Sequence, residues 1–590
     1  MSTRLSTGGR FLTKEKPVHF TFNGKQLRGY EGDTLASALL ANDQMLVGRS
    51  FKYHRPRGIV ASGAEEPNGL VNMGEEGKFE PNQRVTTTEL FEGLSATSQN
   101  HWPSLEFDVG AINKYLSRFM PAGFYYKTFM YPRAFWKHVY EPFIRQAAGL
   151  GKAPKTVDQD TYEHFHAFCD VLVIGGGIAG LQAAKAAAQS GAKVMLLEQT
   201  AQWGGRALVD GGTVDGEPVA DFIEKTIAEL RAMENVTLRN RMMGAGVYDH
   251  GYVLGYERLT DHAPELAGPR HRLWRIRAGH IVTATGAIER PLSFAGNDIP
   301  GVMLASAVRD YVENYGVSVG DRTVVVTNND DAYLTAFAMK FAGLEVPAIV
   351  DARPDSGDSA AMTQAAALGI RVLRGHGIAK VMGNKRVTGV AICVQAGEGA
   401  VLEEINCDAV AMSGGWSPVV HLWSHCGGKL IWDEAQAFFK PDPDKAPKGD
   451  QGQGFVTAAG AANGALILAD TLGDADQAGK AAAVAAGFKA KKSAIPKGQT
   501  PAEAPMLPVW LMPQGASVKL RSKAWLDYQN DVKVSDVQLA AQEGFESVEH
   551  AKRYTTLGMA TDQGKLSNIN GLATLAGALD VKIPQVGTTT

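Results

Sequence analysis

The segment from Val171 to Glu198 constrains the fold of this 590-residue chain more than any other part of it. Four apolar residues, VLVI, lead into Gly175, Gly177 and Gly180, which stand at the spacing GxGxxG. An alanine-rich segment, a glycine and a second apolar run follow, and that run ends in Glu198. This order predicts a buried parallel strand, a tight turn, a helix and a second strand ending in an acid, which is the pattern of a dinucleotide-binding fold.

The chemistry of a dinucleotide requires each part of this pattern. The glycines let a pyrophosphate approach the backbone at the N-terminus of the helix, where the helix dipole favours anions. Glu198 can accept hydrogen bonds from the adenosine ribose, and its charge repels a 2′-phosphate, so NAD is favoured over NADP. A purely structural glycine turn is the alternative, but such a turn needs neither the helix nor the acid.

Composition excludes several other classes of protein. The chain is 45% hydrophobic and 21% charged with a net charge of −3, which does not suit a nucleic-acid surface. No apolar run is long enough to span a bilayer and the N-terminal segment has no signal-peptide core, so we expect a cytoplasmic protein without a membrane partner. Its four cysteines form no CxxC pair, so no disulfide framework or metal site is expected. The aromatic segment 120–136, broken by prolines and basic residues, is interpreted as a packing or interface element rather than a membrane anchor.

We predict an α/β protein with a glutathione-reductase-like core of two dinucleotide folds, of the FAD/NAD(P)-binding type. An Asn-Gly hairpin and a short helix near the N-terminus predict a ferredoxin-like β-grasp domain. Helical periodicity after residue 534, with Ser535 and Ser547 as expected N-caps, predicts a small C-terminal helical domain. The predicted parts are the β-grasp domain, a connector, the NAD-binding domain in two pieces, an inserted second dinucleotide fold and the helical domain: 15–100, 101–166, 167–300 with 405–490, 301–404 and 508–585.

Two positions argue against a second dinucleotide and against FAD. The turn of the inserted fold, 327–332, contains no glycine, so its side chains would obstruct a pyrophosphate, and Asp330 and Asp331 would repel it. We therefore expect a dinucleotide fold without a dinucleotide, the alternative being an unusual but working loop. Gly460-Ala461 stands where FAD enzymes of this architecture carry Gly-Asp, whose acid binds the ribityl–phosphate part of the flavin.

Taken together, these segments resemble the alpha subunits of heterotetrameric sarcosine oxidases over essentially the whole chain. The resemblance implies NAD in the first nucleotide-binding domain of this chain, FAD in a beta subunit that oxidises sarcosine, and FMN at the alpha–beta contact. It implies beta, gamma and delta subunits as partners, and glycine, hydrogen peroxide and formaldehyde or 5,10-methylenetetrahydrofolate as products. The pieces that carry it are GRSFKYHRPRGI with EEPN, the glycine loop with Trp203-Gly-Gly, SGGWSPVVHL, AAGAANG, and EGFESVEHAKRYTTLGMATDQGK with VGTTT.

The chain departs from the cluster-bearing and folate-binding relatives. The loop 48–73 has no cysteine, and the four places that hold cysteines in the iron–sulfur domain of opine and hydroxyproline dehydrogenase subunits carry carboxylate, amide and hydroxyl groups, so neither cluster is expected. The family's folate domain follows VGTTT, where this chain stops, so tetrahydrofolate binding is not expected here. The alternatives are a subunit of a dye-linked dehydrogenase, a scaffold with structural NAD and an FAD-dependent NAD(P)H reductase. The four places are Asp527, Gln529, Asp562 and Ser567.

The resemblance also implies which residues contact NAD. The pyrophosphate is expected over the glycine loop, the adenine against Ala245, and the phosphates or nicotinamide ribose beside Gly205 and Arg206. We nominate no catalytic acid, base or nucleophile and no metal ligand, and we interpret isolated histidines as structural. The basic group Lys52, His54, Arg55 and Arg57 is interpreted as a solvated loop, or as a contact for a flavin phosphate or an acidic partner. The expected NAD contacts are Gly175, Gly177, Ala179, Gly180, Glu198, Gln199, Thr200, Gly205, Arg206, Ala245, Ser417, Leu422 and Ser424.

Overall fold

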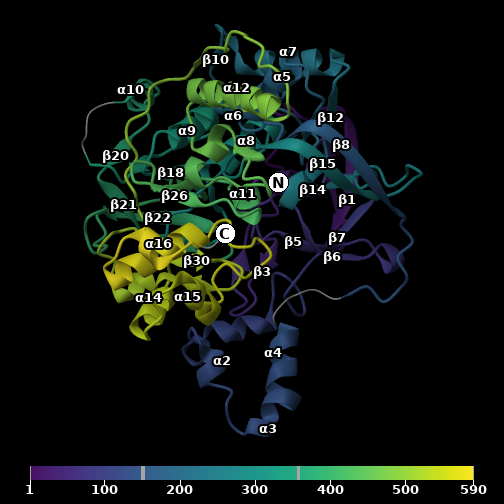
Figure 1. Ribbon diagram of the computed structural model, residues 1–590. Helices are drawn as coiled ribbons and strands as arrows, with labels where there is room; N and C mark the ends of the chain where they lie inside the picture. The colour runs from purple at the N-terminus through teal and green to yellow at the C-terminus, as the bar shows by residue number, and fades with distance from the viewer. Residues whose placement is uncertain (1, 148–152, 355–358, 589–590) are drawn as a thin grey trace. The chain divides into compact units, whose positions relative to one another are not determined.

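The computed structural model describes residues 2–147, 153–354 and 359–588, and its chain divides into two compact units (Figure 1). Unit 1 comprises Met1–Gln159, Glu289–Gly415 and Glu503–Thr589, and unit 2 comprises Asp160–Ile288 and Trp416–Ala502. The predicted fold class is confirmed: a β-grasp sheet, two dinucleotide-type sheets and a C-terminal helical region are all present.

Unit 2 is built on a seven-stranded sheet with the order β12-β9-β8-β15-β14-β13, in which β28 also pairs with β15. The strands β12, β9, β8, the end of β15 and β28 run parallel, whereas β15, β14 and β13 form an antiparallel meander. Its elements are β8 (Tyr162–Ile174), β9 (Val194–Leu197), β12 (Val236–Arg239), β13 (Met242–Tyr248), β14 (Tyr252–Arg258), β15 (His271–Thr283), β28 (Val456–Ala458), α5 (Ile178–Gln189), α7 (Val219–Ala232) and α12 (Leu468–Ala485).

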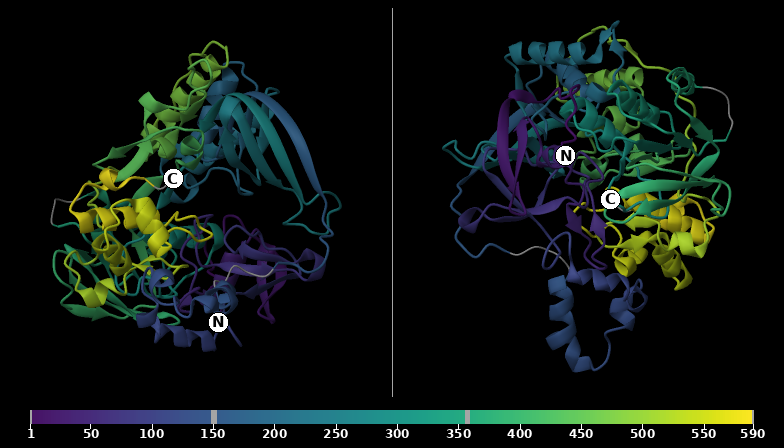
Figure 2. Two further views of the ribbon diagram at one scale, coloured as in Figure 1. Left: turned by 60° about the horizontal axis from the view of Figure 1, so that its bottom comes forward. Right: turned by 180° about the vertical axis from the view of Figure 1, so that it is seen from behind.

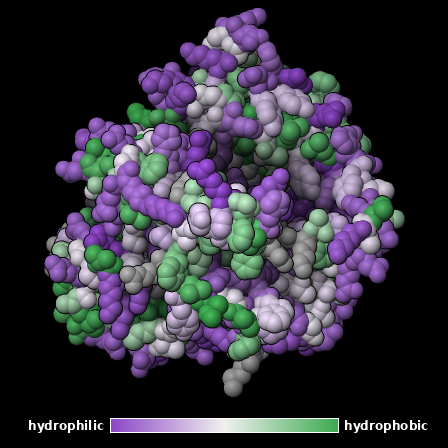
Figure 3. All heavy atoms as spheres, turned by 90° about the horizontal axis from the view of Figure 1, so that it is seen from below, coloured by the Kyte–Doolittle hydropathy of each residue, from purple (hydrophilic) through white to green (hydrophobic). Residues whose placement is uncertain are grey.

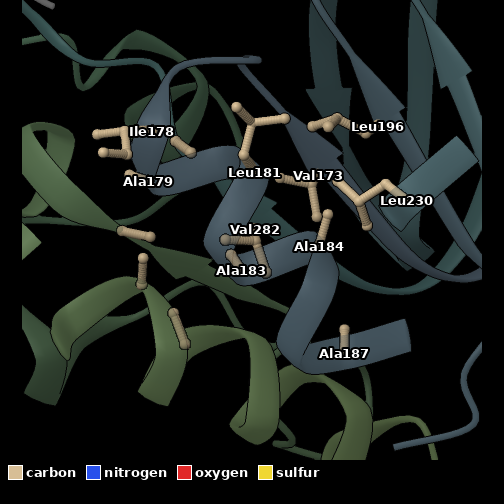
Figure 4. Packing of buried hydrophobic residues seen from close by; sticks show 14 of the residues in the cluster. Val173, Ile178, Ala179, Leu181, Ala183, Ala184, Ala187, Leu196, Leu230 and Val282 are labelled. Atoms are coloured by element: carbon tan, nitrogen blue, oxygen red, sulfur yellow. The ribbon is translucent and has the colours of Figure 1, made fainter. Parts of the chain in front are cut away.

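Small side chains let α5 lie close to its neighbours in this unit. Ala183, Ala184 and Ala187 are fully buried, and Figure 4 shows them among Val173 and other side chains of the sheet and α7. The helices α5 and α12 approach so closely that a Cβ atom on Gly479 would overlap the backbone of Ala183. The alanine-rich composition of α5 therefore follows from contact with the sheet on one side and helices on others.

The N-terminal part of unit 1 is a five-stranded β-grasp sheet with the order β2-β1-β7-β5-β6. Asn23 and Gly24 join β1 to β2 with φ values of 50° and 76°, as a two-residue hairpin turn requires. The predicted helix is present as α1, which is buried along its whole length and capped by Thr34. The elements are β1 (Thr13–Phe22), β2 (Lys25–Glu31), α1 (Leu35–Ala41), β5 (Leu70–Met73), β6 (Glu80–Arg84) and β7 (Leu94–Ser98).

The second dinucleotide-type sheet lies in unit 1 and is parallel throughout, with the order β17-β24-β18-β19-β20. Its central strand β18 is fully buried, which explains its continuous apolar sequence, TVVVT. The elements are β17 (Val302–Leu304), α8 (Ala305–Tyr315), β18 (Thr323–Thr327), α9 (Asp331–Phe341), β19 (Ile349–Asp351), α10 (Ala360–Ala367), β20 (Val372–Arg374) and β24 (Ala409–Ser413).

The rest of unit 1 includes a helical connector and the C-terminal helices. Ser547 is the N-cap of α15, as predicted, but the prediction for Ser535 is wrong: α14 begins one residue earlier, with Lys533 as its N-cap. The cause is Asp536, whose carboxylate accepts the Lys533 N–H at 3.1 Å. In the part of the chain that the structure describes, no helix is both long and apolar enough to cross a membrane. The C-terminal helices are α13 (Val518–Arg521), α14 (Val534–Gln542), α15 (Val548–Thr555) and α16 (Asn568–Leu579).

Candidate nucleotide-binding site

Each glycine of the loop after β8 has its own physical reason to lack a side chain. Gly175 has φ of 110°, and a Cβ atom there would overlap the carbonyl oxygen of Ala284. A Cβ atom on Gly180 would overlap the carbonyl oxygen of Gly175, so this glycine sets the approach of α5 to the loop. Gly177 is different, because a Cβ atom there would meet no protein atom within 4 Å. The middle glycine therefore faces open space at the start of α5, where a pyrophosphate would approach.

Glu198 braces this loop from the end of β9. Its carboxylate accepts the N–H of Gly176 at 2.8 Å and the N–H and hydroxyl of Thr200 at 2.7 and 2.9 Å. Burial raises the pKa of Glu198, while the hydrogen bonds from Thr200 and Gly176 oppose that shift. Since a carboxylate has about four acceptor positions, the three bonds leave room for one further donor, such as a ribose hydroxyl.

A second glycine turn, at 204–205, lies directly beside the first. The N–H of Gly204 donates to the carbonyl of Gly176 at 2.8 Å, and a Cβ atom on Gly205 would come within 3.1 Å of the Cα of Gly177. Arg206 follows, with its guanidinium 2.6 Å from the carboxylate of Asp210 and 4.2 Å from the ring centroid of Trp416. The structure thus brings Gly205 and Arg206 to the open side of the loop and holds the arginine in place.

The other expected contacts around this loop differ in exposure. Gln199 and Thr200 are exposed beyond the end of β9. Ala245 is also exposed, at the irregularity where β13 and β14 shift register between Gly244 and Gly246. Ala179 is buried in the first turn of α5.

The segment 416–424 meets the end of β15 in the same unit. The Thr285 hydroxyl donates to the carbonyl of Val419 at 2.7 Å, and the N–H of Val419 donates to the carbonyl of Gly286. The hydroxyl oxygens of Ser417 and Ser424 are buried and, within the described residues, have no hydrogen-bond partner. Two hydroxyls without partners fit a site that a polar ligand completes, because a buried polar group without a bond is costly.

Leu422 belongs to this segment but packs into the protein. It lies against a buried apolar cluster that includes Leu172 and Trp423. A packing role accounts for its position without a nucleotide.

Asp474, Trp416 and Asp210 are site residues that the sequence did not indicate. Asp474 on α12 accepts the N–H of Gly460 at 2.6 Å and the side chain of Asn463 at 2.9 Å. Burial raises the pKa of Asp474, and both hydrogen bonds oppose that shift. The strand end without an acid of its own therefore receives a carboxylate from 14 residues further along the chain, a separation for which no local motif exists.

The loop of the second dinucleotide fold, in unit 1, is covered by the chain itself. Asn328 and Asp330 are buried, and residues 504–507 lie against them. The N–H of Ala504 donates to Asp330 at 2.8 Å, and the Asn328 amide donates to the carbonyl of Leu507 at 2.7 Å. This segment supplies the polar contacts at the loop that a nucleotide would otherwise make.

A buried arginine neutralises the acids of that loop. Arg353 lies 2.6 Å from Asp330 and 2.7 Å from Asp351, the acid that ends β19. Burial lowers the pKa of Arg353, but the two carboxylates outweigh it and raise the pKa above its usual value. The ribose-binding position of this fold is therefore occupied by an internal ion pair.

The basic loop near residue 50 is paired rather than solvated. Arg55 and Arg57 both form ion pairs with the buried carboxylate of Asp298, and His54 Nδ1 lies 2.8 Å from Asp108. The interpretation of these residues as a solvated loop is wrong for Arg57, whose side chain is only 1% exposed. Sequence distance hid this pairing, because Asp298 lies 241 residues away from Arg57.

The four places without cysteines form a buried polar group in unit 1. Asp527 accepts the N–H groups of Asn530 and Gly558 at 2.8 and 2.9 Å. Burial, together with the nearby charge of Asp562, raises the pKa of Asp527 to about 7, and burial raises the pKa of Asp562 as well. Gln529 accepts hydrogen bonds from Thr561. Within the described residues, no group of three or more His, Cys, Asp or Glu side chains is arranged to hold a metal ion.

Three sequence families match parts of the chain. These are the 2Fe-2S iron-sulfur cluster binding domain over residues 15–101, the pyridine nucleotide-disulphide oxidoreductase family over 169–436, and the sarcosine oxidase A3 domain over 521–590. The first match rests on a domain type whose cluster ligands are cysteines, and the sequence has no cysteine between residues 15 and 101.

Curated relatives match over the whole chain. The sarcosine oxidase alpha subunit of Rhizobium meliloti is 46% identical over 100% of this chain and 58% of its own length. That of Corynebacterium sp. strain P-1 is 38% identical over 98% of this chain and 55% of its own length. The chain thus spans a little over half the length of these relatives. One of the two opine oxidase subunits of Agrobacterium tumefaciens is 25% identical over 52% of this chain and 64% of its own length.

One solved structure covers the whole chain. It is an L-proline dehydrogenase from P. horikoshii, with a TM-score of 0.66 and 19% identity over 100% of this chain and 97% of that one. At this identity the likeness concerns the fold alone.

Proposed function

Because the chain is related along its whole length to the alpha subunits of sarcosine oxidase, we propose that it is the NAD-binding subunit of such an oxidase. In this proposal sarcosine is oxidised on FAD in a beta subunit, FMN lies at the contact of the two subunits, and gamma and delta subunits complete the enzyme. The products are glycine, hydrogen peroxide and either formaldehyde or 5,10-methylenetetrahydrofolate. This chain supplies a nucleotide site and no acid, base or nucleophile for the oxidation.

The single observation that carries the proposal is the open side of Gly177, next to the braced acid Glu198. The backbone around Gly177 leaves room for a pyrophosphate, and the helix dipole of α5 favours its charge. Glu198 keeps an acceptor position for the adenosine ribose and disfavours a 2′-phosphate. When bound, NAD would supply a nicotinamide ring that can accept or donate a hydride.

The remaining residues of the site would hold the rest of the nucleotide. The buried hydroxyls of Ser417 and Ser424 would gain a polar partner, and Arg206, fixed by Asp210 and Trp416, would lie along a phosphate. Ala245, exposed at the bulge, would offer a flat contact for adenine. The absence of a carboxylate at Ala461 supports NAD over FAD at this site.

The purified chain tests the identity of the nucleotide. We expect it to be colourless and to release NAD on heat denaturation, detected by chromatography of the supernatant. A yellow chain that releases FAD would overturn the proposal.

Two alternatives remain distinguishable in the assembled enzyme. If NAD takes part in electron transfer, addition of sarcosine should raise the absorbance near 340 nm. Unchanged absorbance with normal sarcosine turnover would support a protein whose NAD is structural. A role in a dye-linked dehydrogenase is disfavoured because hydrogen-bonded polar side chains occupy the cluster positions at 527 and 529.

A further inference from the structure

A helical projection of unit 1, residues 109–147, exposes an unusual amount of apolar side chain. We refer to residues 109–147 as the arm; Figures 1 and 2 show its helices extending from the rest of the unit. Of the 33 large apolar side chains that are exposed in the described part of the chain, 13 lie between residues 102 and 143. Its elements are η2 (Val109–Lys114), η3 (Ser117–Phe119), α2 (Phe124–Lys127), α3 (Arg133–Phe135), η4 (Trp136–Tyr140) and α4 (Glu141–Ala147).

The base of the arm is fixed to unit 1. The hydroxyl of Tyr53 donates to the carbonyl of Met120 at 2.9 Å, and Lys127 pairs with Glu543 and with the hydroxyl of Tyr554. A Cβ atom on Gly123 would overlap the ring of Tyr554, so backbone and ring are in direct contact there. The direction in which the arm leaves the unit is therefore set by specific contacts.

The arm also has a small aromatic core of its own. The ring centroids of Phe129 and Tyr140 are 5.2 Å apart, and those of Phe135 and Tyr140 are 6.0 Å apart. The hydroxyl of Tyr140 donates to the carbonyl of Tyr131 at 2.9 Å. These contacts join the two sides of the arm, so its shape is set before any partner binds, which lowers the entropy cost of binding.

One apolar stripe runs along the continuous helical segment 133–147. Phe135, Val139 and Phe143, four residues apart, are 47%, 48% and 73% exposed, and the neighbouring Trp136 is 38% exposed. None of the residues of α3 or η4 is buried. An exposed stripe at this spacing is the feature by which an amphipathic helix enters an apolar groove.

The charges on the arm are nearly all of one sign. Among its side chains that the structure describes, five are basic and one, Glu141, is acidic. Arg133 and Lys137 are exposed within the same helical segment as the stripe. A complementary surface therefore has an apolar floor and an acidic rim. Figure 3 views the molecule from the side toward which the arm projects, and apolar and hydrophilic side chains lie intermixed on that face.

We propose that the arm is a docking element that inserts the Phe135–Phe143 stripe into an acidic-rimmed apolar groove on another subunit of the oxidase. This inference rests on the proposed function, which supplies the other subunits. A second copy of this chain is a poor occupant, because it would bring basic arms together. Exposed aromatic side chains beside basic ones are typical of hot spots at protein interfaces.

Co-expression of this full chain, carrying a tag, with the proposed beta, gamma and delta subunits tests the arm. The first variant carries Phe135→Ser with Phe143→Ser, and the second carries Arg133→Glu with Lys137→Glu. Both change exposed side chains, so the thermal unfolding and the NAD content of the isolated chain should not change. The matched control is Phe341→Ser, which removes an exposed aromatic ring of the same unit outside the arm.

We expect each arm variant to lose at least about tenfold in affinity for one of the other subunits in titrations, with the control unchanged. The charge variant should also lose most of the salt dependence of that binding. Arm variants that assemble as well as the unaltered chain would overturn the docking role while leaving the proposed function standing. An unaltered chain that forms no complex would overturn both. Binding of the isolated chain to vesicles of phosphatidylglycerol, abolished by the arm variants without any loss of assembly, would assign the arm to a membrane surface instead.

Discussion

Replacing Gly177 by alanine separates nucleotide binding from folding, because this glycine faces no other part of the protein. Its backbone has φ of −69° and ψ of 178°, which alanine adopts without strain, and the added Cβ would meet no heavy atom within 4 Å. Alanine has fewer unfolded conformations than glycine, so we expect the free energy of unfolding to stay the same or rise by about 0.4–1 kcal/mol. The methyl group would, however, fill the space proposed for the pyrophosphate. We expect NAD to bind about tenfold more weakly or worse, a loss of about 1.4 kcal/mol.

Two further glycine variants frame this measurement. Gly180→Ala places a Cβ against the carbonyl of Gly175, so it should lower both the stability of the chain and its NAD affinity. Gly577→Ala lies at an exposed position of α16 where a Cβ meets nothing, so it should stabilise the helix by about 0.5–1 kcal/mol without changing NAD binding. Urea unfolding gives the stabilities, and calorimetric titration of NAD into nucleotide-free chain gives the affinities.

Two results would refute the reasoning. Equal NAD affinity for Gly177→Ala and the unaltered chain would mean that no phosphate passes over Gly177. A marked loss of stability in Gly177→Ala would mean that the open side of the loop is filled by protein.

Three other changes have defined outcomes. Glu198→Gln should weaken NAD binding and raise the affinity for NADP relative to NAD, because the charge that repels the 2′-phosphate is gone; an unchanged ratio in titrations would contradict this role. Arg353→Met should lower the free energy of unfolding in urea by about 3–5 kcal/mol, because it leaves the buried carboxylate of Asp330 without its cation; a loss below about 1 kcal/mol would contradict it. The stability of the chain should fall as the pH rises from about 4 to about 7, because the native state retains a proton on the Asp527–Asp562 pair that the unfolded chain releases. Asp562→Asn removes the like charge and should flatten that fall, and a pH profile as steep as that of the unaltered chain would exclude this pair as its cause.

Local sequence suffices for the first nucleotide-binding fold because every part of its signal lies between residues 171 and 198. The glycine spacing, the alanine-rich helix and Glu198 each reflect a contact made inside one strand–helix–strand unit. The Asn23-Gly24 hairpin and the helix capped by Thr34 were predictable for the same reason. The Ser535 cap was not, because Asp536 competes for the helix start one residue earlier.

The sequence by itself determined that this chain contains a dinucleotide fold with a favoured ligand and a second fold without glycines at its loop. Tertiary structure alone decided that residues 504–507 cover that second loop, that Asp474 serves Gly460, and that Arg57 is buried against Asp298. The physical reason is distance along the chain. A turn or cap is specified by neighbours whose conformations are coupled through the backbone, whereas a buried ion pair or a covering segment joins residues whose separation leaves no periodicity or spacing in the sequence.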